Sequence, residues 1–203
     1  MNPLDPTRTA FIAVHLQNDI VAEGGAFAPI FADELERNLT IQKAGELLDV
    51  ARAAGAFVVF ARVGFRSDYR DMVANVPLLQ MAKASNALVN DTWQTEITRS
   101  LDVAEDDLVL THTRTSPFHA SPLDALLRQR NINNVVVLGV ATNASVEDAA
   151  RTAANLGYRT VVACDASSAA TVEAHEAALA SFALFGEVAT NAQIRGAIGR
   201  VGS

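Results

Sequence analysis

The part of the sequence that decides the fold is the stretch VVVLGVATNASVE, residues 135–147. Its four leading apolar residues have the length and composition of a buried β-strand. The chain then enters a helical pattern that continues through Ala149, Ala150 and Ala153. The first turn of a helix offers unpaired N–H groups and a partial positive charge, which stabilise a developing oxyanion. A hydroxyl in this turn, on Ser145, makes the segment a candidate active-site elbow.

Strand-like and helix-like segments alternate on both sides of this elbow. Apolar runs that alternate with amphipathic helices are typical of a parallel sheet covered on both faces. We therefore predict a doubly wound α/β fold with a mainly parallel, six-stranded sheet and helices on both faces. The expected strands are residues 11–14, 57–63, 108–111, 135–139, 160–163 and 187–189. The expected helices are residues 38–54, 122–130, 146–156, 174–185 and 191–201, with a shorter helical piece around 77–87.

Length and composition limit what the chain can be. Its 203 residues, half of them hydrophobic, suffice for one sizeable core, so we expect a single domain over residues 1–203. The formal net charge of −7 argues against nucleic acids and anionic membranes as partners. Neither a transmembrane run nor a signal peptide is visible, and one cysteine cannot form an internal disulfide. These features favour a cytoplasmic protein that acts on a small molecule.

Two histidines fall where a ligand would bind in such a fold. In an open parallel sheet, ligands bind beyond the carboxyl ends of the strands. His15 follows the first expected strand and His112 follows the third, so both are expected beside the elbow that carries Ser145. The chain has four histidines in all, and the position of two of them at strand ends indicates a functional site.

Several short motifs share their order and spacing with a known family. They are AVHLQND at 13–19, RTSPF at 114–118, LDALL at 123–127, GVATNASVE at 139–147, and LGYR at 156–159 followed by Asp165 and Ala166. From Thr9 to Ala169 the sequence therefore resembles the isochorismatase-like hydrolases, a family of nicotinamidases, other small amidases and isochorismatases. The resemblance implies a doubly wound fold and a homodimer or larger homo-oligomer.

The resemblance also points to three catalytic positions, and this chain departs from the family at each of them. The family uses an aspartate, a lysine and a cysteine, and the matching residues here are His15, His112 and Ser145. A shift of one residue would put Thr113 in place of His112. A serine hydroxyl is much less acidic than a thiol and needs a general base, for which histidine is suited. The set is therefore chemically coherent, but the sequence does not say which histidine is the base.

An oxyanion hole and a cis peptide bond at the elbow are further implications of the resemblance. The backbone N–H groups of Ala141 and Ser145 would bind the substrate oxygen, and the cis bond would join Val140 to Ala141. We expect no metal and no cofactor, because residues 62–69 lack the histidine of the metal-binding cluster of nicotinamidase-like members. Residues near the strand ends are candidate substrate contacts: Gln17, Phe65, Arg66, Arg114, Phe118, His119 and Asn143.

Three functions remain open at this level. The first is hydrolysis of an amide, an ester or lactone, or a similar carbonyl bond, with Ser145 as nucleophile and His15 and His112 as acid–base residues. The second is cleavage of a vinyl ether without a covalent step, with His15 as the acid. The third is a catalytically degenerate protein that binds a ligand or acts as a scaffold. A histidine nitrogen within hydrogen-bond distance of the Ser145 hydroxyl favours the first, whereas a pocket filled by Phe65 or Phe118, or histidines turned away from it, favours the third.

Overall fold

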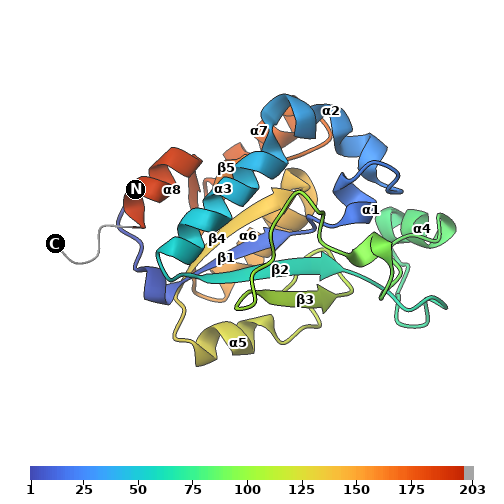
Figure 1. The fold of residues 1–203 in the computed structure, drawn as a ribbon, viewed down its shortest axis with the longest axis horizontal. Coiled ribbons are helices and arrows are strands. Elements are labelled where there is room, and N and C mark those ends of the chain that lie inside the picture. Colours follow the sequence, from blue (N-terminus) through green and yellow to red (C-terminus); the bar gives the residue numbers. More distant parts are fainter. Residues whose placement is uncertain (199–203) are drawn as a thin grey trace.

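Six parallel strands form one sheet at the centre of the computed structural model, which describes residues 1–198 (Figure 1). Their order across the sheet is β3-β2-β1-β4-β5-β6, so the chain winds from the middle of the sheet to one edge and then to the other. All paired neighbours run parallel, which confirms the predicted doubly wound α/β fold. The strands are β1 (Thr9–Val14), β2 (Phe57–Val63), β3 (Leu108–His112), β4 (Asn134–Val140), β5 (Arg159–Ser168) and β6 (Glu187–Ala189).

Alternate side chains of each strand enter two separate cores. In β1, Phe11 and Ala13 belong to the core on one face of the sheet, whereas Ala10, Ile12 and Val14 belong to the core on the other. The alternation follows from the two-residue repeat of a strand, and both sets are apolar because helices cover both faces. The helices that contribute include α3 (Thr40–Ala53) and α8 (Asn191–Ala197) on the first face, and α5 (Leu123–Gln129), α6 (Glu147–Asn155) and α7 (Val172–Phe182) on the second.

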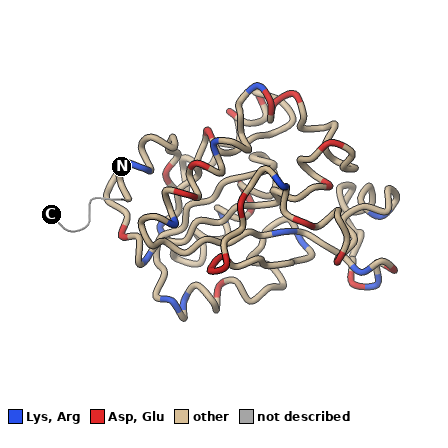
Figure 2. Tube along the Cα trace, viewed as in Figure 1, with Lys and Arg blue, Asp and Glu red and all other residues tan. Residues whose placement is uncertain are grey.

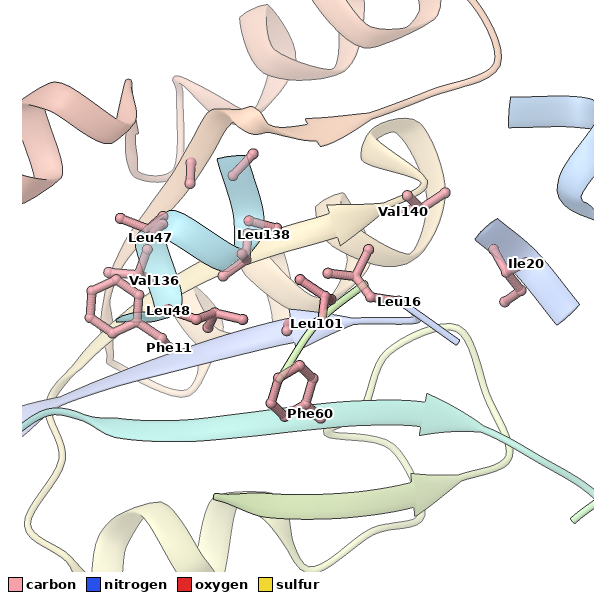
Figure 3. Packing of buried hydrophobic residues seen from close by; sticks show 14 of the residues in the cluster. Phe11, Leu16, Ile20, Leu47, Leu48, Phe60, Leu101, Val136, Leu138 and Val140 are labelled. Carbon is pink, nitrogen blue, oxygen red and sulfur yellow. The ribbon is translucent and has the colours of Figure 1, made fainter. Parts of the chain in front are cut away.

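The core beneath α3 shows how a helix is held to the sheet. Leu47 and Leu48 of α3 are buried in one cluster with Phe11, Val136 and Leu138 of the strands (Figure 3). Replacing a buried leucine by alanine costs about 2–5 kcal/mol, because the transfer free energy is lost and a cavity remains. Packing of this kind makes the sheet rigid and fixes the positions of the strand ends.

Three helices lie around the carboxyl ends of the strands: α1 (Asn18–Val21), α2 (Ala28–Asn38) and α4 (Pro77–Ala84). In Figure 1, α1 and α4 stand beyond the arrowheads of β1 and β2. The expected helix 38–54 is α3, whereas α2 was not expected, because no helix was predicted over residues 28–37. Leu39 has a left-handed backbone conformation (φ 52°) that ends α2 and lets α3 begin at Thr40. The expected helical piece at 77–87 is α4 and ends at Ala84.

Other helix boundaries differ from the prediction by a few residues. The expected helix 146–156 begins at Glu147, because Thr142–Val146 forms a separate π-helical turn, η3. The expected helix 174–185 begins earlier, at Val172, where the Thr171 hydroxyl caps the helix by accepting a hydrogen bond from the Ala174 N–H. The expected helix 191–201 is α8 up to Ala197, and residues 199–201 of that prediction lie outside the described residues. The short 3₁₀ helices are η1 (Pro6–Arg8) and η2 (Trp93–Thr95).

Acidic and basic side chains are interspersed along the chain (Figure 2). Arg52 is an example, because it pairs with Asp49 on its own helix and with Asp107 before β3, both at 2.8 Å. Ion pairs at a protein surface contribute about 0–1 kcal/mol each, so the two cores dominate the stability. Every helix within residues 1–198 is too short or too polar to span a bilayer.

Candidate active site

The first feature of the site is a pair of histidines at the ends of β1 and β3. His15 follows β1 in a left-handed conformation (φ 57°), and its backbone N–H donates to the Ala61 carbonyl of β2 at 2.8 Å. Histidine adopts this conformation more readily than a β-branched residue does. His112 ends β3, and its Nε2 lies 3.1 Å from Nε2 of His15. The two rings are stacked with their centroids 5.0 Å apart, so His112, and not Thr113, is the partner of His15.

Both histidines are buried and neutral at neutral pH. Burial lowers the pKa of His15 well below its ordinary value, and the neighbouring His112 lowers that pKa further. Burial also lowers the pKa of His112 to about 4, an effect that the Arg114 backbone opposes. Nδ1 of His112 is buried and has no hydrogen-bond partner among the described residues. The Arg114 backbone therefore forms no hydrogen bond of normal geometry with the His112 ring. The contact between the two Nε2 atoms therefore joins two neutral imidazoles, one as donor and one as acceptor.

The elbow connects β4 to α6 through the turn η3. The peptide bond Val140–Ala141 is cis, as the resemblance implies. The Ala141 carbonyl accepts hydrogen bonds from the N–H groups of Ala144 and Val146, both at 3.1 Å, but none from the Ser145 N–H between them. The N–H of Ala141 donates to no backbone carbonyl among the described residues outside the regular elements. The Ala141 N–H is therefore a backbone donor at the elbow without a backbone partner in that part of the structure.

Gly139 allows the elbow to lie beside the end of β1. Its φ of 120° is in a region that L side chains rarely adopt. A Cβ added there would lie 2.2 Å from the carbonyl oxygen of Val14. The absence of a side chain at this position thus lets the backbone leading to Ser145 pass directly beside the backbone leading to His15.

Ser145 and His15 open onto a common cavity of about 90 Å³. Both side chains are 4% exposed. Among the described residues, no histidine nitrogen forms a hydrogen bond with the Ser145 hydroxyl; Nε2 of His15 and Nε2 of His112 contact each other instead. His112 lies behind His15 and does not line the cavity. The wall comes from segments far apart in the sequence, and its apolar members include Ile20, Phe27, Phe31, Val63, Leu79 and Leu88.

Two buried polar side chains hold this wall in place. The Gln17 side chain donates from Nε2 to the Val63 carbonyl (2.9 Å) and accepts at Oε1 from the Val63 N–H (2.8 Å). The Asp19 carboxylate accepts from the N–H of Ala26 (2.9 Å) and from the N–H of Leu88 (2.7 Å). Because Val63 and Leu88 line the cavity, Gln17 and Asp19 position its wall from behind.

Sequence and fold both match one group of known proteins. The isochorismatase domain model matches residues 9–193. The chain belongs to the isochorismatase family. It is 31% identical over 175 residues to an isochorismatase family protein of Escherichia coli O157:H7, covering 86% of this chain and 87% of that protein. It is 33% identical over 177 residues to a ureidoacrylate amidohydrolase of Rhizobium rhizogenes, covering 80% and 71% of the two chains.

A solved structure of the same group has a closely similar fold. The cysteine hydrolase of Pseudomonas syringae pv. phaseolicola superimposes with a TM-score of 0.87 at 27% identity, over 98% of this chain and 95% of that one. These similarities identify the protein as a hydrolase of the isochorismatase family.

The two aromatic residues expected to line the pocket, Phe65 and Phe118, lie outside it. Phe65 is fully buried and packs beside Tyr69, with ring centroids 6.3 Å apart. Phe118 packs beside Tyr158 in the other core, with centroids 6.2 Å apart. Neither ring lines or fills the cavity, which leaves the space beside Ser145 open.

Of the polar residues expected to contact substrate, Arg114 lines the cavity and four others do not. Gln17 is committed to the Val63 backbone. Arg66 is exposed and pairs with Asp68 at 3.1 Å. His119, 4.0 Å from Asp148, and Asn143 are also exposed. The expectation for these residues came from their nearness in sequence to strand ends, which does not determine where a side chain points.

The apolar side chains that α2 and α4 contribute to the cavity lining were not expected from the sequence. Phe27 and Phe31 come from the start of α2, and Leu79 and Ala82 come from one face of α4. The spacing of Leu79 and Ala82 by three residues was a usable signal, because such residues share a helix face. His175 of α7 was also missed as a neighbour of the elbow, where its Nδ1 lies 2.8 Å from the Thr142 hydroxyl.

No other residue in the described structure offers an obvious nucleophile or metal site. Cys164 lies on β5 away from the cavity, and burial, with a further effect of Asp165, raises the pKa of its thiol. A protonated, half-buried thiol is a poor nucleophile. Within residues 1–198, no group of three or more His, Cys, Asp or Glu side chains is placed to hold a metal ion.

Proposed function

We propose that this protein hydrolyses the amide, ester or lactone bond of a small organic acid through an acyl-enzyme at Ser145. The observation that carries the proposal is that Ser145 and His15 open onto the same cavity while His112 is hydrogen-bonded behind His15. The arrangement matches that of a nucleophile, a base and a third residue that orients the base. The similarity to a ureidoacrylate amidohydrolase supports a carbonyl substrate.

The geometry favours His15 as the base and His112 as its positioning residue. Nε2 of His15 is occupied by His112, which leaves Nδ1 as the nitrogen that can take a proton from Ser145. If Nδ1 of His112 carries the proton of that ring, next to the Arg114 backbone, its Nε2 accepts from the N–H of His15. His112 then fixes the tautomer of His15 and shares the positive charge that His15 gains.

The reaction follows from these positions. The Ser145 oxygen attacks the carbonyl carbon as its proton moves to His15, and the negative charge on the substrate oxygen faces the backbone N–H groups of Ala141 and Ser145. The leaving amine or alcohol takes the proton from His15. Water then attacks the acyl-serine ester, gives a proton to His15, and releases the acid as His15 returns a proton to Ser145. A positioned base contributes about 10²–10⁴-fold to such a rate, and each oxyanion donor about 10²–10³-fold.

The other two functions receive less support from the site. Vinyl-ether cleavage needs an acid, but a histidine whose pKa is lowered is neutral at neutral pH and a weak proton donor. A degenerate protein would be favoured by a filled pocket, and the cavity beside Ser145 is open. The missing hydrogen bond between His15 and Ser145 is compatible with catalysis, because such bonds are often long before substrate binds.

The proposal also covers the location of the protein, its domain organisation, its assembly and its substrate contacts. We place the protein in the cytoplasm, as one domain over residues 1–203 that forms a homodimer or larger homo-oligomer and needs no cofactor. Arg114 lines the cavity, and we propose it as a substrate contact. For Gln17, Phe65, Arg66, Phe118, His119 and Asn143 the structure offers no contact with the cavity, so the proposal does not include them.

A serine-reactive fluorophosphonate tests the proposal. Intact-mass analysis of the treated protein should show one adduct in the wild type and in Ser67→Ala, an exposed serine variant that serves as control. Ser145→Ala should show none, and His15→Gln should react much more slowly because the base is lost. A wild type that stays unlabelled while folded, or an adduct that persists in Ser145→Ala, would exclude Ser145 as an activated nucleophile.

A further inference from the structure

The lining residues of the Ser145 cavity that are buried, which we call its floor, include no Lys, Arg, Asp or Glu in the described part of the chain. Apart from His15 and Ser145, the buried members of the lining are apolar, and they include Ile20, Leu79 and Leu88. His15 is neutral at neutral pH for the reasons given above. The lining hydroxyl of Thr115 is already used, because it donates to Asp148 at 2.5 Å. A charged group placed on this floor would lose its hydration without gaining a partner, which is strongly unfavourable.

Arg114 also lines the cavity, but it is partly exposed, and we call the partly exposed part of the lining the mouth. Its Nη1 lies 3.3 Å from the Val73 carbonyl and 3.5 Å from Oδ1 of Asn75. Leu78, which is 39% exposed, and the partly exposed Phe31 also border the opening. The buried lining is thus apolar, and the charged guanidinium group belongs to the partly exposed lining, so the acyl group of a substrate belongs against the buried residues and its leaving group toward Arg114.

The size of the cavity limits the acyl group. Its volume is about 90 Å³. A water molecule occupies about 30 Å³ in the liquid, and an apolar cavity of about 150 Å³ in another protein accepts benzene. On that scale, the cavity holds roughly three or four non-hydrogen atoms, enough for the apolar part of a small acyl group, and an aromatic acyl group needs α4 or α2 to move.

We propose that the substrate is an amide or ester of a small, uncharged, apolar carboxylic acid, whose acyl group lies against Ile20, Leu79 and Leu88. The inference rests on the proposed function for the position of the carbonyl group beside Ser145, and it names the substrate class of that site. The acyl group is transferred from the leaving nitrogen or oxygen to Ser145 and then to water, with His15 carrying the protons as described above.

Binding to the full-length Ser145→Ala protein tests this class without any turnover. Three amides have nearly the same shape and differ in one group: isobutyramide has a methyl, lactamide a hydroxyl and alaninamide an ammonium. We expect isobutyramide to shift the backbone amide signals of Leu88 and Ala144 in an NMR titration. Lactamide should bind about tenfold to a hundredfold more weakly, and alaninamide should not bind measurably. Equal affinities, or tighter binding of alaninamide, would overturn the inference.

A matched pair of variants on α4 tests the location. Ala82 is 1% exposed and lines the cavity, whereas Ala84 on the same helix is exposed. In the Ser145→Ala background, Ala82→Val should weaken isobutyramide binding at least about fivefold by filling part of the cavity, and Ala84→Val should leave it unchanged. Equal affinity in Ala82→Val and its parent would place the ligand elsewhere and overturn the inference. Matching far-UV circular dichroism of the two variants establishes that both are folded.

The binding test and the labelling test fail independently. Isobutyramide selectivity without fluorophosphonate labelling would keep the apolar site and remove the serine mechanism. Labelling of Ser145 without selectivity among the three amides would keep the mechanism and remove the substrate class. The comparison therefore separates what the pocket recognises from what Ser145 does.

Discussion

Acid should destabilise this protein through His15 and His112 before its carboxylates begin to titrate. The His112 pKa is about 4 in the folded protein, and a histidine in an unfolded chain has a pKa near its ordinary value of about 6.5. Protons therefore bind the unfolded chain first, so the stability is fully present above about pH 6.5 and is lost as the pH falls toward 4. Over the about 1.5 pH units between pH 6.5 and 5, at about 1.4 kcal/mol per unit, His112 alone removes about 2 kcal/mol. His15, whose pKa is also lowered, acts in the same direction.

Urea unfolding followed by far-UV circular dichroism, at about pH 7.5 and about pH 5, measures this loss. We expect the free energy of unfolding of the wild type to fall by at least about 2 kcal/mol between these conditions. His112→Gln should lose about 2 kcal/mol less, because the titrating group is gone while a polar partner for His15 remains. The exposed Ser67 supplies the control, since Ser67→Ala should keep the wild-type pH dependence. A wild-type stability that is flat over this interval, or an unchanged dependence in His112→Gln, would refute the argument that both rings are buried and neutral.

Three further changes probe the supports and the mouth of the site. Asp19→Asn removes one of two carboxylate acceptors for the N–H groups of Ala26 and Leu88, and it should lower the free energy of unfolding by about 1–3 kcal/mol in urea titrations. Thr142→Val removes the 2.8 Å contact with His175 and should cost about 1 kcal/mol in the same assay, whereas an unchanged value would mean that the contact does not brace the elbow. Arg114→Gln should raise KM for esters with an anionic leaving group while kcat and the KM for neutral esters stay near the wild type, and equal KM changes for both kinds of ester would count against a place for Arg114 at the mouth.

The arrangement of the sheet was predictable because its signal is local and repeated. Valine-rich runs such as residues 135–138 alternate with helical patterns, and the rules for parallel sheets turn that alternation into a doubly wound fold. The start of α3 at Thr40 instead of residue 38 was not predictable from the pattern, since it depends on a left-handed conformation at Leu39, a residue type that does not signal such a turn.

The candidate catalytic positions were recognisable for a different reason. His15, His112 and Ser145 lie at or just after the end of a strand, and strand ends of a parallel sheet converge on one edge. Which histidine faces the cavity depends on the left-handed turn at His15 and on the packing of His112 behind it, and neither is written in the residue types. The substrate wall was harder still, because it combines side chains from α1, α2, β2 and α4 whose meeting is a tertiary property.

The most direct measurement is a search for the acyl-enzyme itself. The wild type and Ser145→Ala are mixed with the p-nitrophenyl ester of isobutyric acid, quenched in acid, and examined by intact mass and peptide mapping. We expect a wild-type adduct with the mass of one isobutyryl group, located on the peptide that contains Ser145, and no adduct in the variant. Release of p-nitrophenol by the wild type without any adduct on Ser145, or an adduct on Cys164 instead, would contradict the account.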